Sequence, residues 1–216
     1  MSKKVMEIYE EYKIMPNLQE HQLRVAAVAF FICDSLDMPL PKYEIILACL
    51  LHDMGNIIKS DLAYFPDFLE PEGLQYWEDV QESFFKKYGR DEHVATDDIV
   101  REIGVSQKVL NFINRVGFSN SAQNELEEFF EYKICNYADM RVGPYGVLSL
   151  EDRLSEGNKR YKGRPHTVAS EKFGSLFNSI KIVESQIFTH ANTKPEDITD
   201  EVIAPIMTNL RNFVIK

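Results

Sequence analysis

Cysteine, long apolar runs and positive charge are all scarce in this 216-residue chain, and each scarcity excludes a class of protein. The three cysteines, Cys33, Cys49 and Cys135, fall inside apolar helical patterns without paired spacing, which indicates free core thiols in a reducing compartment rather than a disulfide framework. No apolar run approaches the length of a bilayer span, so we expect neither membrane insertion nor export. The net charge of −10 argues against coating of nucleic acids or anionic membranes. We therefore expect a cytoplasmic protein that handles small substrates in a local pocket.

Strand patterns are missing as well, since no alternation of apolar and polar residues extends beyond about four positions. The sequence contains no internal repeat, no low-complexity segment and no linker to a second domain. Apolar residues instead recur at helical spacing almost throughout the chain. The sequence therefore predicts an all-α fold in which residues 1–216 form one domain of about eight to ten helices. We expect its core at about 18–142, with the helices of 143–216 completing or flanking that core.

Proline, glycine and the helical periodicity indicate where the helices begin and end. The first two expected helices cover about residues 16–36 and 42–54, and Gly55 supplies the stop signal of the second. A loop rich in aromatic residues and proline follows at about 59–73, and it is either a lid over a site or a packed connection. Further helices are expected at about 74–87, 92–103, 106–115, 122–141, 149–161, 168–191 and 200–214, the last two being candidates for an appended hairpin.

Side chains that bind metals interrupt the apolar faces of three expected helices. His52 and Asp53 follow the apolar run 45–51, where burying both together costs free energy unless something compensates. His21 lies on the apolar stripe of the first helix, and Asp139 lies on the apolar face of a later one. A single buried histidine is more often a hydrogen-bonded core residue, and a single aspartate is more often a helix cap. Spacing alone therefore leaves a metal site and a set of core residues equally open.

The four residues together have a recognisable order. His21, then His52-Asp53 within the sequence LLHDMGN, then Asp139 resembles the HD-domain superfamily of metal-dependent phosphohydrolases, whose pattern is H…HD…D. The resemblance covers roughly residues 18 to 142. It implies that His21, His52, Asp53 and Asp139 bind one divalent metal ion (Mn, Fe, Ni, Co, Zn or Mg), for which a mixed nitrogen and oxygen shell is suited. The motif is specific for the fold and the metal, and it says little about the substrate.

Two departures from the family pattern bear on the number of metals and on the catalytic base. Members with two metals carry further histidines between the HD pair and the last aspartate; His93 lies where one is expected, but Phe118 lies where the second would be. The resemblance therefore implies one metal, and His93 contacts the substrate or its leaving group unless it is an ordinary helix-start residue. Asn56 stands where other members carry Glu or Lys. Its amide can orient water or a phosphoryl oxygen, but it cannot act as a general base at neutral pH.

Several polar residues are candidates for the remaining roles. Asp53, Asp61 and His93 are candidates for assisting the deprotonation of water. Lys59 is a candidate phosphate contact, although a solvated surface position is the commoner fate of a residue such as Lys59 or Asp61. Arg24 shares a helix face with His21, and Arg141 closely follows the last aspartate, so we expect these two arginines to bind phosphate ahead of others. The others belong to a basic segment of Arg153, Lys159, Arg160, Lys162 and Arg164.

The sequence thus favours a phosphohydrolase with a single metal that acts on a small phosphorylated metabolite, with a nucleotide as a candidate. The alternative is a ligand-binding or regulatory module that retains the metal with little turnover, a reading motivated by Asn56 and the missing second histidine. A di-iron oxygenase is a third and weaker option. The aromatic-rich helical surface is compatible with a homodimer.

Overall fold

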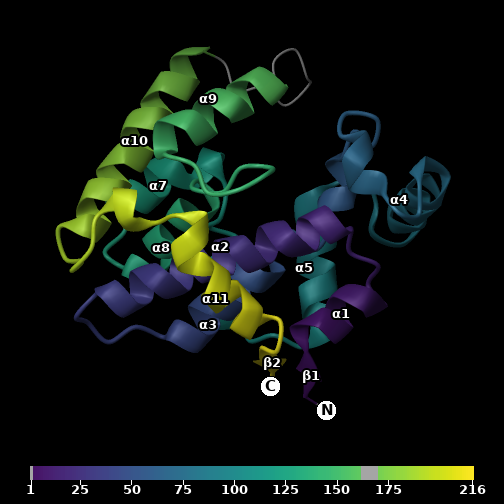
Figure 1. The fold of residues 1–216 in the computed structure, drawn as a ribbon, viewed down its shortest axis with the longest axis horizontal. Helices are drawn as coiled ribbons and strands as arrows, with labels where there is room; N and C mark the ends of the chain where they lie inside the picture. Colours follow the sequence, from purple (N-terminus) through teal and green to yellow (C-terminus); the bar gives the residue numbers. More distant parts are fainter. Residues whose placement is uncertain (1, 162–169) are drawn as a thin grey trace.

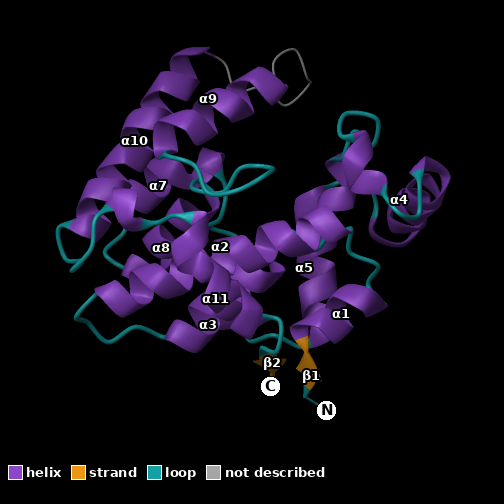
Figure 2. Ribbon diagram, viewed as in Figure 1, coloured by secondary structure: helices purple, strands orange, loops and turns teal. Residues whose placement is uncertain are grey.

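The computed structural model describes residues 2–161 and 170–216, and this part of the chain is built almost entirely from helices (Figures 1 and 2). Its α-helices are α1 (Val5–Glu11), α2 (Pro16–Ser35), α3 (Lys42–Leu51), α4 (Leu74–Tyr88), α5 (Glu92–Ile103), α6 (Gln107–Ile113), α7 (Ser121–Leu126), α8 (Phe130–Asp139), α9 (Leu150–Tyr161), α10 (Ser170–Phe188) and α11 (Asp200–Leu210). Short 3-10 helices are η1 (Asn56–Lys59), η2 (Pro66–Leu69), η3 (Phe118–Asn120) and η4 (Pro195–Asp197). The strands β1 (Lys3–Lys4) and β2 (Val214–Ile215) pair antiparallel near the two termini. The all-α fold class predicted from the sequence is confirmed.

The helix count among the described residues is slightly above the expected eight to ten, for two reasons. Helix α1 was not predicted, although its buried residues Val5, Ile8 and Tyr9 have helical spacing. The single helix expected at about 122–141 is instead two, α7 and α8, because the backbone becomes extended at Glu127 and again at Phe129. Helix α8 is therefore a separate helix from α7, and Asp139 is its last residue.

The core is centred on α2 and α3, which pack against each other. Every residue of α3 from Ile45 to Leu51 is buried, as is typical of a helix enclosed on all sides. Helix α8 packs against both central helices, α11 packs against α2, and α10 packs against α7 and α8 (Figure 1). The last two helices thus each lie on the core, which is not the arrangement expected of an appended hairpin. In the described part of the chain, no helix has the length and apolar character that a membrane crossing requires.

Gly55 has a different role from the stop signal expected from the sequence. Helix α3 ends at Leu51, so His52 and Asp53 lie in the turn after the helix. Gly55 has a φ of −91°, a value that any residue adopts. A Cβ added there would lie 2.5 Å from the backbone oxygen of Glu92 and 2.8 Å from the backbone nitrogen of Thr96. The glycine is needed because the turn after α3 packs directly on the first turn of α5.

Candidate metal centre

His52 is oriented by the helix that precedes it. Its Nδ1 lies 2.8 Å from the backbone oxygen of Cys49, one turn back along α3. Because a carbonyl oxygen only accepts hydrogen bonds, Nδ1 carries a proton, and it is Nε2 that can present a lone pair to a metal ion when the ring is neutral. The side chain of His52 is 3 % exposed, so this nitrogen is held in one direction by a rigid, buried element. Metal-binding histidines are commonly fixed through their second ring nitrogen in this way.

Helices α2 and α8 bring the other polar side chains of the predicted site to His52. His21 Nε2 lies 3.6 Å from Asp53 Oδ2 and 3.2 Å from Asp139 Oδ1. His52 Nε2 lies 3.7 Å from each of the same two oxygens. The ligand atoms of His21, His52 and Asp53 are all within 4.8 Å of one another and could hold a metal ion. The structure thus places His21, His52, Asp53 and Asp139 side by side, as their order in the sequence predicted.

The donor set fits a divalent metal because one of its atoms has no hydrogen-bond partner among the described residues. Nε2 of His52 is buried, and the nearest carboxylate oxygens, 3.7 Å away, are beyond hydrogen-bond distance. A buried polar atom without a partner costs about 1–3 kcal/mol, and such atoms are rare in native proteins. Two imidazole nitrogens beside carboxylate oxygens form the kind of shell that first-row divalent metals accept. A cation between these residues would satisfy the unpartnered nitrogen and the carboxylate charges together.

The electrostatics of the group favour positive charge at this position. Burial lowers the pKa of the His52 imidazole, but the carboxylates of Asp53 and Asp139 outweigh burial and raise the pKa to about 9. Burial by itself raises the pKa of the Asp139 carboxyl, yet His21 and His52 outweigh it and hold that pKa well below its usual range. Both shifts have one origin, which is the close placement of carboxylates and imidazoles out of water. A divalent cation bound between these residues would supply the positive charge that the carboxylates favour, without protonation of His52.

Two amide side chains hold Asp53, and the sequence indicated only one of them. Asn56 Nδ2 donates to Asp53 Oδ2 over 2.7 Å, so the amide holds the carboxylate, and its expected contact with water or a phosphoryl oxygen stays a prediction. Gln22 is fully buried, and its Oε1 accepts from the backbone N–H of Asp53 at 3.2 Å. Gln22 was missed, although it interrupts the apolar face of α2 immediately after His21. That interruption was the available signal.

A cleft of about 540 Å³ opens over these residues. Its lining residues come from α2, from η1 and η2, from the start of α5 and from α9. Ten of the residues singled out from the sequence line this cleft: His21, His52, Asp53, Asn56, Lys59, Asp61, His93, Asp139, Arg153 and Arg160. The cleft therefore joins the metal-binding group to most of the residues that the sequence indicated for substrate binding.

Three further candidates that line the cleft, His93, Asp61 and Lys59, are exposed to solvent to different extents. His93 lies at the start of α5 with 79 % of its side chain exposed, and it lies outside the His21–His52–Asp53 group. Asp61 is exposed in the loop after η1. Lys59 Nζ lies 3.5 Å from Glu92 Oε1. These three line the cleft at positions from which they can reach a ligand, and their roles remain predictions.

Two arginines are not where the sequence led us to expect them. Arg24 turns away from the cleft, and its Nε donates to Asp200 Oδ1 of α11 at 3.1 Å. Arg141 is buried and is not a cleft residue; its guanidinium donates to the Tyr137 hydroxyl and to backbone oxygens of Leu148, Pro195 and Ile198. The expectation that these two bind phosphate ahead of others is therefore corrected. Arg24 was placed by helix periodicity, but α11 covers that side of α2, and Arg141 lies beyond the end of α8, where periodicity no longer applies.

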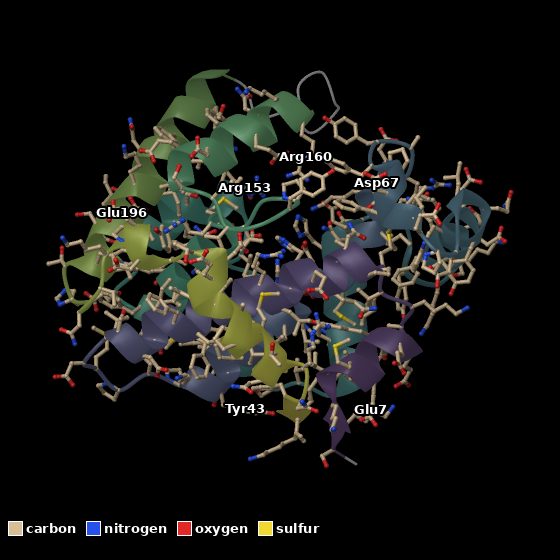
Figure 3. All side chains as sticks on the ribbon, viewed as in Figure 1. Glu7, Tyr43, Asp67, Arg153, Arg160 and Glu196 are labelled. Atoms are coloured by element: carbon tan, nitrogen blue, oxygen red, sulfur yellow. The ribbon has the colours of Figure 1, made fainter. Side chains whose placement is uncertain are left out.

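Cations reach the cleft from α9 instead. Arg153 and Arg160 both line it, on the side that faces η2 (Figure 3). Arg153 is 13 % exposed, and its Nε donates to the backbone oxygen of Val142 at 2.5 Å. Arg160 pairs with Glu156 at 3.0 Å, and with Lys159 it also lines a neighbouring pocket of about 310 Å³. Lys162 and Arg164 of the same basic segment lie outside the described residues.

Comparison with known families agrees with this geometry. The model of the HD domain family matches residues 18–139, which is more than half of the chain and contains all four residues of the H…HD…D pattern. No curated protein and no solved structure matches the chain. The match to the family model and the convergence of His21, His52 and Asp53 establish the same conclusion: this chain belongs to the HD domain family.

Proposed function

We propose that this protein is a phosphohydrolase that uses one divalent metal ion and acts on a small phosphorylated metabolite, with a nucleotide as the first candidate. HD-domain proteins are in general metal-dependent hydrolases. The observation that carries the proposal is the buried, unpartnered Nε2 of His52 at a cleft that also contains arginines. A site for a divalent cation next to guanidinium groups suits a phosphate ester better than a neutral substrate.

His21, His52, Asp53 and Asp139 are the proposed metal ligands. A divalent ion held by them would polarise a phosphoryl oxygen and lower the pKa of water at the site. Asp53 is the ligand best placed to assist proton removal, because 21 % of its side chain remains exposed toward the cleft. Asn56 fixes the orientation of the Asp53 carboxylate through its hydrogen bond to Oδ2. Asp61 and His93 are the other proposed proton acceptors, and both line the same cleft.

Arg153, Arg160 and Lys59 are the proposed partners of the phosphate oxygens, because all three line the cleft. Arg153 is the most firmly positioned of them, since its hydrogen bond to the Val142 carbonyl holds the guanidinium plane. Arg160 and Lys59 are paired with Glu156 and Glu92. A phosphate dianion would compete with these carboxylates for the same cations. Together the cations would offset negative charge on the phosphoryl group as it transfers.

A second function, a metal-retaining ligand-binding module with little turnover, is favoured by one observation. Asn56 occupies a position where other members carry Glu or Lys, and its amide nitrogen is engaged with Asp53. The site therefore lacks an additional charged side chain at that point of the turn. The two functions differ in turnover and agree on the metal.

The test combines elemental analysis of protein purified without chelator with a hydrolysis screen over nucleotides, sugar phosphates and dinucleotides. We expect a bound divalent metal and hydrolysis of at least one class. Asp53→Ala should abolish hydrolysis or deplete the metal, whereas the exposed Asp37→Ala should leave both unchanged. Metal without turnover across the screen would favour the binding module. Full metal content and full hydrolysis in Asp53→Ala would refute the proposed site.

A further inference from the structure

A cluster of aromatic rings lies at the same cleft as the metal-binding group. Phe65 and Phe68 of the loop around η2 both line the cleft and pack on each other with ring centroids 4.9 Å apart. Tyr64, which also lines the cleft, contacts the Phe65 ring edge-on at 4.6 Å. Tyr145 follows the cleft residue Pro144 and is not itself a lining residue; it joins the cluster with its ring 6.0 Å from Phe65 and 5.4 Å from Phe68. Two loops about eighty residues apart in the chain thus meet through rings at one side of the cleft.

Tyr145 is presented by a turn that is fixed at both ends. Val142 and Val147 form an antiparallel bridge, and the N–H of Gly143 donates to the oxygen of Gly146 at 2.8 Å. Asp200 accepts a hydrogen bond from the N–H of Val147 at 3.0 Å. Although the turn is held in place by these hydrogen bonds, 69 % of Tyr145 is exposed to solvent. Its contacts with Phe65 and Phe68 leave most of this side chain open to solvent.

The rings on the η2 side also remain open to the cleft. Phe65 and Phe68 are only half-buried, and both belong to a site whose other lining residues include His52 and Arg160. Rings that keep part of their faces exposed beside a charged site offer stacking surface to a flat ligand. The charged end of a phosphate ester and a ring on its leaving group would then be bound by separate parts of one cleft.

We infer that Phe65, Phe68 and Tyr145 bind a flat aromatic ring on the leaving group of the substrate. The inference rests on the proposed function, and it narrows the substrate to phosphate esters whose leaving group carries a ring system of nucleobase or phenol type. The rings provide selectivity among phosphate esters, while the metal-binding group and the arginines act on the phosphate that all of them share. A contact that merely joins two loops would instead affect every substrate equally.

The experiment compares three phosphate esters: adenosine 5′-monophosphate, p-nitrophenyl phosphate and ribose 5-phosphate, which has no aromatic ring. The variant Phe68→Leu removes a ring but keeps apolar volume, and Phe68→Tyr keeps the ring as the matched control. Tyr145→Ala and Tyr145→Phe form a second pair at an exposed position, where folding is least affected. Metal content is measured for each variant.

Loss of a stacking ring is expected to lower kcat/KM for a ring-bearing ester, relative to ribose 5-phosphate, by at least about fivefold. Phe68→Leu and Tyr145→Ala should show this loss, and Phe68→Tyr and Tyr145→Phe should not. A loss confined to the nucleotide identifies a nucleobase, and one confined to p-nitrophenyl phosphate identifies a phenol-type ring. An equal loss for all three esters, or no loss for either ring-bearing ester, would overturn the inference.

Equilibrium binding separates this inference from the proposed function. If the wild-type protein hydrolyses none of the three esters, their affinities are measured by calorimetry on the same variants. Tighter binding of the ring-bearing esters that is lost in Tyr145→Ala would uphold the ring site while the hydrolase proposal fails. Equal affinity for ring-bearing and ring-free esters would overturn the ring site.

Discussion

The base of the cleft and its walls are built in different ways. At the base, His52 and Asp139 are buried, and the imidazole nitrogens lie 3.2–3.7 Å from carboxylate oxygens. On the walls, Arg153, Phe68 and their neighbours come from α9 and from loops that pack around the core. The residues of the base lie on α2 and α8 or directly after α3, whereas Arg153 and Phe68 of the walls come from elements outside these helices. Under the proposed function, metal binding therefore belongs to the core of the fold, and substrate choice belongs to its periphery.

This division has a direct experimental consequence. Changes at the base should alter metal affinity and affect every substrate, whereas changes on the walls should alter the response to particular substrates at constant metal content. A wall variant that loses metal, or a base variant that affects one substrate only, would contradict this division.

The largest expected effect is the dependence of metal affinity on pH. The carboxylates of Asp53 and Asp139 outweigh burial and raise the pKa of His52 to about 9, so below that pH a metal ion must displace a proton. Affinity should rise with pH up to about 9, by roughly a hundredfold between pH 6 and pH 8. Titration of the metal against a chromophoric chelator at several pH values measures this slope. Affinity that is flat over this range would contradict the assigned role of His52.

The same shift has a stability consequence of defined sign. Because the folded-state pKa of His52 is above its unfolded value, the protonated imidazole stabilises the chelator-treated protein fully below about pH 6.5. That contribution is lost as the pH rises through about 9. Thermal melts with and without metal should therefore diverge as the pH increases.

A smaller effect is expected from the hydrogen bond that orients Asp53. Asn56→Ala removes the donor at 2.7 Å from Asp53 Oδ2, and loss of such a supporting contact typically lowers metal affinity ten- to hundredfold. Asn114→Ala, another asparagine that lines the cleft, serves as the control. Equal metal affinity in Asn56→Ala and in the wild type would show that Asp53 does not depend on this contact.

The smallest expected effect is a difference in kcat/KM between variants of Arg153, which lines the cleft, and of Arg24, which does not. Arg153→Met should lower kcat/KM about tenfold, since hydrogen bonds to charged groups contribute about 1.5–3 kcal/mol. Arg24→Met should leave kcat/KM nearly unchanged, because Arg24 is paired with Asp200 outside the cleft. Metal content should be equal in the two variants. A larger decrease in kcat/KM in Arg24→Met than in Arg153→Met would contradict the assignment of Arg153, rather than Arg24, as the phosphate contact.

The base of the cleft could be predicted from the sequence because its signals are local and have a recognisable order. His21 and the His52-Asp53 pair interrupt apolar patterns whose periodicity indicates which helix face is buried. That periodicity left a metal site and ordinary core residues equally open, and the resemblance of the H…HD…D order to the HD family pointed to the metal site. The same reasoning missed Gln22, although it interrupts the same face of α2 and holds the backbone of Asp53.

The walls could not be predicted in this way because they depend on distant parts of the chain. Arg24 lies on a helix with His21, but Asp200 of α11 determines where its side chain points. Arg153 has no local pattern that distinguishes it from other basic residues, and only the packing of α9 brings it to the cleft. The requirement for glycine at position 55 also depends on a distant segment. The backbone of Glu92 and Thr96 in α5 leaves no room for a Cβ there, which explains the glycine better than a helix stop does.

The most direct test of the account is the metal stoichiometry of the full chain purified without chelator, measured beside His52→Ala. The account predicts one divalent ion per chain in the wild type and close to none in the variant, because Nε2 of His52 is the buried atom that the metal satisfies. A wild-type chain without metal, or a His52→Ala chain that retains its full metal content, would contradict it.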